Sequence, residues 1–146
     1  MNRATAAAKI GLRWPAQLTD AGLTATDTSA NISEPIDDAL RLLGYGEADL
    51  ATADVPVEDV PDYLAALAYT TLSLVLARLA DRFDLTTGGK SLRLQQSFAN
   101  TERLLARAAS DVLARFGSLT GGARDGVIGL DLNYLSPGPL DDRVWV

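Results

Sequence analysis

Carboxylates are the residues of this 146-residue chain with most scope for chemistry, because the sequence contains no His and no Cys. Disulfides, Cys/His zinc sites, histidine-activated nucleophiles and histidine acid–base steps are therefore excluded. Any general acid or base would have to be a carboxylate. No EF-hand spacing is present, and adjacent acids on a helix diverge, so we interpret the acidic pairs as solvated or interface charges and expect no enzyme, metal or cofactor. The pairs are Asp37/Asp38, Glu58/Asp59 and Asp141/Asp142.

Residues 86–91 read Thr-Thr-Gly-Gly-Lys-Ser and end like a phosphate-binding loop. A Walker A loop needs a glycine five positions before Gly89, where this chain has Asp84, and it must follow a β-strand. A helical pattern precedes the segment instead. The sequence therefore predicts a turn between two helices.

Charge is unevenly distributed along the chain, whose net charge is −6. Residues 20–62 hold eleven acids and one base, a net −10, whereas residues 78–115 hold seven bases and four acids, a net +3. Such regions can join copies head to tail or can meet within one monomer, and the sequence leaves both open. The arginines of the second region either contact nucleic acid or act as surface charges, but the acidic total opposes a main role in gripping phosphates. They are Arg78, Arg82, Arg93, Arg103, Arg107 and Arg115.

Helical periodicity is strongest over residues 61–83 and 91–116, which a short Gly-containing segment separates. Pro61 fits a first helical turn and Gly117 a helix stop. The fold class we expect is all-α, a small helical bundle built on a long antiparallel helical hairpin. The predicted core residues are Leu64, Leu67, Leu72, Val75, Leu76, Leu79, Leu94, Phe98, Leu105 and Val112.

The remaining segments are predicted to form an extended arm at each end of the helical domain. We divide the chain into an N-terminal arm (1–32), a helical domain (33–117) and a Gly-rich C-terminal arm (118–146). The domain opens with a short helix capped by Ser33, with Pro35 in its first turn and Gly44 after its end. In the C-terminal arm, residues 130–134 alternate apolar and polar in a brief strand-like pattern. The longest uncharged run, residues 63–77, is shorter than a membrane span, so we expect no membrane partner and no secretion.

This layout resembles the head-tail connector (adaptor) proteins of long-tailed bacteriophages and related gene transfer agents. The resemblance lies in the acidic helix at residues 36–44, the helix "VPDYLAALAYTTLSLVLARLADRFDL", the Lys90-Ser91 turn, and a helix with Phe98 and "TERLLARAASDVL". It covers residues 33–116 and is one of pattern and order, without a catalytic signature. The C-terminal segment departs from the family pattern.

The resemblance implies a structural virion protein that forms a ring, usually of twelve copies, beneath the portal protein. Its partners would be other copies of itself, the portal, and a tail, stopper or tail-terminator protein. DNA would pass through the ring without specific binding. The protein would be assembled in the host cytoplasm and reside at the head-tail interface of the virion.

Four apolar side chains are the predicted partner-interface residues, because they lie in segments with little core of their own. An alternative function is a small helical nucleic-acid-binding or packaging accessory protein that uses the arginine faces. The four interface candidates are Trp14, Tyr134, Leu135 and Trp145.

Overall fold

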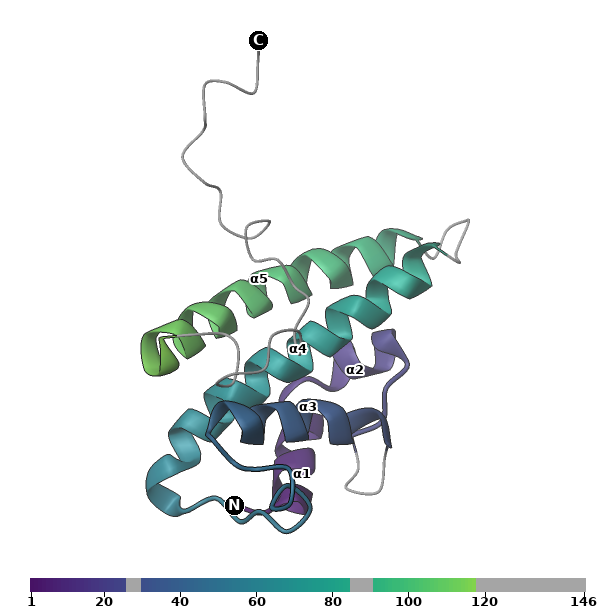
Figure 1. The fold of residues 1–146 in the computed structure, drawn as a ribbon. Coiled ribbons are helices and arrows are strands. Elements are labelled where there is room, and N and C mark those ends of the chain that lie inside the picture. The colour runs from purple at the N-terminus through teal and green to yellow at the C-terminus, as the bar shows by residue number, and fades with distance from the viewer. Residues whose placement is uncertain (26–29, 85–90, 118–146) are drawn as a thin grey trace, which may run out of the picture.

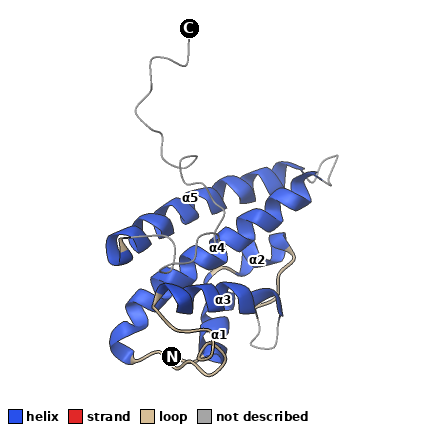
Figure 2. Ribbon diagram, in the orientation of Figure 1, coloured by secondary structure: helices blue, strands red, loops and turns tan. Residues whose placement is uncertain are grey.

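The computed structural model describes residues 1–25, 30–84 and 91–117, and these segments form five α-helices with no β-strand among them (Figure 1 and Figure 2). The all-α class predicted from the sequence is confirmed. The helices are α1 (Arg3–Arg13), α2 (Pro15–Ala21), α3 (Ala30–Leu42), α4 (Val60–Asp84) and α5 (Ser91–Phe116), with a 3-10 turn η1 (Val57–Asp59) leading into α4.

Helices α4 and α5 lie side by side as the long antiparallel hairpin that the apolar periodicity predicts (Figure 1). Their bounds agree with the predicted ranges to within one residue. Gly117, with φ of 67°, ends α5 in the left-handed conformation that glycine adopts without steric cost. Of the ten predicted core residues, seven are buried, while Leu64, Leu94 and Phe98 are partly buried against the same core.

Helix α4 is the central element, because α5 packs on one side of it and α1, α2 and α3 pack on the other (Figure 1). By length and composition alone, the segment Val57–Arg82 is apolar enough to cross a membrane, although its uncharged run is short. Within the fold, 67% of its most apolar window is buried. Contact with four helices accounts for this apolar character, because such a helix needs apolar residues on nearly all sides.

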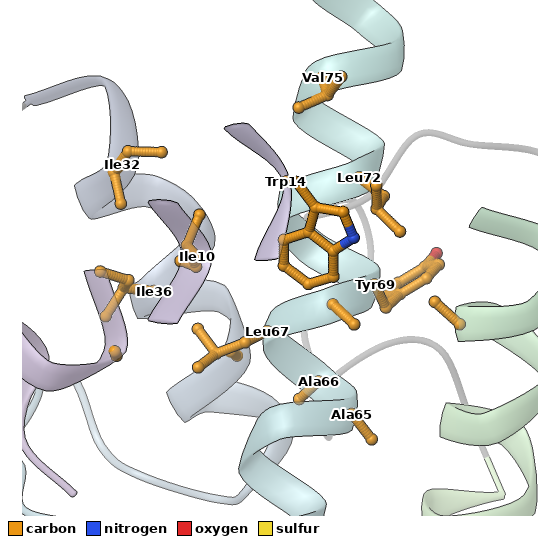
Figure 3. Close-up of a cluster of buried hydrophobic side chains, with 14 of the residues drawn as sticks. Ile10, Trp14, Ile32, Ile36, Ala65, Ala66, Leu67, Tyr69, Leu72 and Val75 are labelled. Carbon is orange, nitrogen blue, oxygen red and sulfur yellow. The ribbon is translucent and has the colours of Figure 1, made fainter. Parts of the chain in front are cut away.

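The N-terminal region is not an extended arm, and this part of the prediction is wrong. Residues 3–21 form two helices whose apolar side chains enter the common core, so no domain boundary lies at residue 32. The Asn2 side chain caps α1 by accepting the Thr5 amide at 2.9 Å. Ile10 lies in one cluster with Ile36 of α3 and Leu67 of α4 (Figure 3).

Helix α3 also begins earlier than expected, at Ala30, so Ser33 is not its cap and Pro35 lies inside the helix. Proline removes the amide that would bond to the Asn31 carbonyl. Asn31 is exposed, so water can satisfy that carbonyl. The Pro35 carbonyl accepts a hydrogen bond of 2.8 Å from the buried Thr70 hydroxyl of α4, which ties the two helices together.

Candidate functional site

Trp14 is the one interface candidate that falls within the described residues; Tyr134, Leu135 and Trp145 lie outside them. It sits at the junction of α1 and α2, where Pro15 opens the second helix. Its side chain is 5% exposed and belongs to the core, so the reason for choosing it, a segment without a core, does not hold. The Arg13 guanidinium lies 5.0 Å from the centre of the Trp14 ring, a cation–π contact at the protein surface.

A groove of about 510 Å³ opens between the α1–α2 junction, α4 and α5, with Trp14 as part of its wall. Three alanines on the facing sides of α4 and α5 create the space, because larger side chains there would fill it. The floor is apolar and the rim carries two guanidinium groups and one carboxylate. The lining consists of Arg13, Trp14, Pro61, Leu64, Ala65, Ala68, Leu72, Leu104, Arg107, Ala108 and Asp111.

Some of the charged side chains at the rim of this groove form ion pairs and others do not. Arg115 donates to Asp111 at 3.1 Å and to Asp62 at 2.6 Å, so the Asp111 carboxylate already has a cationic partner. Arg13 and Arg107 are exposed and form no ion pair with a described residue. The groove therefore combines an apolar floor with positive charge that the described fold leaves unpaired.

The acidic and basic regions of the sequence meet within one monomer at both ends of α5. At its N-terminal end, Asp20 accepts from Arg93 at 3.1 Å and from the Ser97 hydroxyl at 2.9 Å, while Arg82 donates to the Asp20 carbonyl. At its C-terminal end, Arg115 pairs with Asp62. Part of the charge asymmetry is thus neutralised within one monomer, which is one of the two arrangements that the sequence left open.

Other described charges form no ion pair, among them an acidic set and a basic set. The acidic loop, residues 44–59, carries five acids and no base, and three of its acids are exposed and form no ion pair with a described residue. The hairpin arginines, a name used here for Arg78, Arg103 and Arg107, are likewise exposed and unpaired among the described residues. The three unpaired acids of the loop are Asp49, Glu58 and Asp59.

Burial is the main cause of the shifted pKa values of one carboxyl and two tyrosine hydroxyls, whereas hydrogen bonds to carboxylates raise the pKa of Arg41 and of Arg115. Burial raises the pKa of Asp38, and the hydrogen bond from Arg41 opposes that shift. Burial also raises the pKa of Tyr63 to about 12 and the pKa of Tyr69 above its usual value. In the described part of the chain, no group of three or more acidic side chains is placed to hold a metal ion.

The segment that ends like a phosphate-binding loop lies between α4 and α5, and residues 85–90 fall outside the described residues. A helix, not a β-strand, leads into it, so the context that a Walker A loop requires is missing.

Comparison with known proteins gives no relative: no protein-family model, no curated protein and no solved structure matches this chain.

Proposed function

We propose that the protein is a structural assembly protein, a head-to-tail adaptor that forms a ring between a portal and a tail and continues the DNA channel. The observation that carries the proposal is the separation of the acidic loop from Arg78, the first of the hairpin arginines, on the helical bundle. Both surfaces keep unpaired charge, and each is complementary to the other on a second copy.

The spacing of the two surfaces favours contact between copies. Arg78 lies 18 residues beyond Val60, the first residue of α4, so it stands about 27 Å along the helix from the end of the acidic loop. This distance exceeds the Debye length of roughly 8 Å at physiological salt, so Arg78 and the exposed acids of the loop barely affect each other within a monomer. Arg107 lies nearer to the loop, because it lines the same groove as Pro61 of α4. A contact between unlike surfaces of two copies is heterologous and closes into a ring when the rotation allows.

The net charge also suits a DNA channel. Each phosphate that a protein neutralises adds salt-dependent affinity, so a ring that guides DNA must avoid many such contacts. A chain with a net charge of −6 meets this requirement. The alternative, a nucleic-acid-binding accessory protein, has fewer free cations to use, because Arg82, Arg93 and Arg115 are engaged inside the fold.

A charge-reversal experiment tests the proposed contact. Glu58→Lys and Arg103→Glu should each weaken self-association of the full chain in sedimentation velocity, and an equimolar mixture of the two variants should associate better than either alone. Glu34→Lys is the matched control, because it makes the same charge change at an exposed position of α3 outside the acidic loop. Self-association that none of the three variants alters would contradict the contact.

DNA binding separates the two functions. The adaptor should bind duplex DNA weakly and with little dependence on salt. Tight binding whose affinity falls steeply with salt would favour the accessory protein instead.

A further inference from the structure

We propose that the groove between the α1–α2 junction, α4 and α5 is the docking site for residues 130–135 of the same chain. The inference is independent of the ring and the portal. It rests on three observations: the chemistry of the groove, the place where the chain leaves α5, and the sequence that follows.

The groove has room for a few side chains and offers them both apolar and polar contacts. Its volume of about 510 Å³ lies within the usual range of 300–1,000 Å³ for small-molecule sites, and leucine and alanine side chains make up much of its lining. Leu64 and Leu104 pack against the core but are only partly buried, so apolar area remains for an occupant to cover. Arg13 and Arg107 supply positive charge at the rim.

The chain leaves the helical bundle close to this groove. Asp111 lines the groove, and α5 ends five residues later at Phe116. The Arg115–Asp62 ion pair holds this end of α5 beside the start of α4, where Pro61 also lines the groove. From Gly117, 13 residues lead to Leu130, a reach of up to about 43 Å when extended. Residues 118–129 are therefore long enough for residues 130–135 to reach any part of the groove.

The sequence of residues 130–135 complements the groove. It reads Leu-Asp-Leu-Asn-Tyr-Leu, so in an extended conformation Leu130, Leu132 and Tyr134 share one face. That face suits the apolar floor, and the Asp131 carboxylate suits a rim guanidinium. Residues 118–146 as a whole carry four acids and two bases, a net −2 opposite the unpaired arginines of the rim.

The covalent link between α5 and residues 130–135 favours docking within one chain over docking between two copies. A short flexible linker gives its attached ligand an effective concentration in the millimolar range. At micromolar protein concentration, docking within one chain therefore exceeds docking between chains by a wide margin.

Cysteine cross-linking in the full chain tests the proposal, because the natural sequence has no Cys. In the variant A68C/L132C, a thiol on the groove floor should meet the docked segment and form an intrachain disulfide. In the control A114C/L132C, the first thiol is exposed on α5, nearer to Gly117 but outside the groove. If residues 130–135 did not dock, the thiol at position 132 would react faster with the thiol at position 114 than with the one at position 68. If they dock in the groove, the thiol at position 132 should react with the one at position 68 about tenfold faster or more.

A second variant checks that the segment itself directs the reaction. Adding Leu130→Ser and Tyr134→Ser to A68C/L132C should lower the rate of disulfide formation to that of the control, while the urea midpoint stays unchanged. Mass spectrometry and non-reducing gels distinguish the products. An equal or faster reaction at position 114 would overturn the proposal, and so would disulfides that form between chains.

Discussion

Shortening Ile10 to alanine should destabilise the whole protein, because this α1 side chain is 1% exposed and packs in the core that α3 and α4 share. The substitution removes three carbon atoms, which corresponds to about 2.4 kcal/mol at about 0.8 kcal/mol per methylene. The cavity that remains adds to this loss, so the free energy of unfolding should fall by about 3 kcal/mol, within the range of roughly 2–5 kcal/mol for such substitutions.

Leu12→Ala is the matched control in the same helix. It removes the same number of carbon atoms from a side chain that is 82% exposed, so its effect should stay within about 0.5 kcal/mol. Alanine favours the helix at both positions by only a few tenths of a kcal/mol.

Urea unfolding followed by far-ultraviolet circular dichroism measures both changes. We expect one cooperative transition whose midpoint falls for Ile10→Ala and stays in place for Leu12→Ala. Equal, small effects of the two substitutions would contradict this prediction, because they would mean that residues 3–21 do not share the core of the hairpin.

Three further predictions concern buried polar groups and one glycine. Thr71→Val should leave the free energy of unfolding unchanged or raise it by about 1 kcal/mol, because the buried Thr71 hydroxyl has no partner among the described residues. Thr70→Val should lower the free energy of unfolding by about 1 kcal/mol, because it removes the hydrogen bond to the Pro35 carbonyl of α3. Chemical denaturation of both variants measures the difference. Burial raises the pKa of Tyr63 from 10.0 to about 12, so its contribution to stability is present below pH 10 and lost as the pH rises through 12. Two pKa units correspond to about 2.7 kcal/mol, and Tyr63→Phe should remove up to that much of the alkaline fall in unfolding free energy; equal alkaline slopes in both proteins would contradict this. Gly22→Ala should lower the free energy of unfolding by about 1–2 kcal/mol, because Gly22 has a φ of 71° and a Cβ there would lie 3.3 Å from the Arg82 guanidinium carbon. Gly46→Ala is the control, because a Cβ at Gly46 meets only an ordinary contact at 3.7 Å. Thermal unfolding compares the two variants.

The hairpin could be predicted from the sequence because its signals agree with one another. Large apolar residues recur at helical spacing over both long segments, Pro61 suits the beginning of the first helix, and Gly117 suits the end of the second. Each of these signals is local, so no knowledge of the tertiary contacts was needed.

The N-terminal helices were missed because their buried face is made largely of small residues. Ala6 and Ala7 are completely buried, yet alanine carries little weight in a hydrophobic pattern. The signals that could have found α1 were the Asn2 cap and the four-residue spacing of Ile10, Trp14 and Leu18. Threonines in the same region concealed this spacing.

The groove could not be predicted from the sequence, because its walls come from three parts of the chain. Ala68 and Ala108 look like ordinary core alanines, and only the packing of α4 against α5 leaves space beside them. Likewise, the net charge of residues 20–62 does not reveal that Asp20 and Asp62 are paired with arginines of α5 while the acidic loop is free of them. Long-range contacts determine which charges remain available.

Co-assembly with a portal protein is the most direct test of the proposed function. The purified full chain would be mixed with portal rings and imaged by cryo-electron microscopy, with light scattering to follow the mass of the complex. We expect a ring of this protein seated on the portal and continuing its channel, formed from subunits that are monomeric or weakly associated in isolation. No co-assembly under any condition, with the protein remaining dispersed beside intact portal rings, would contradict it.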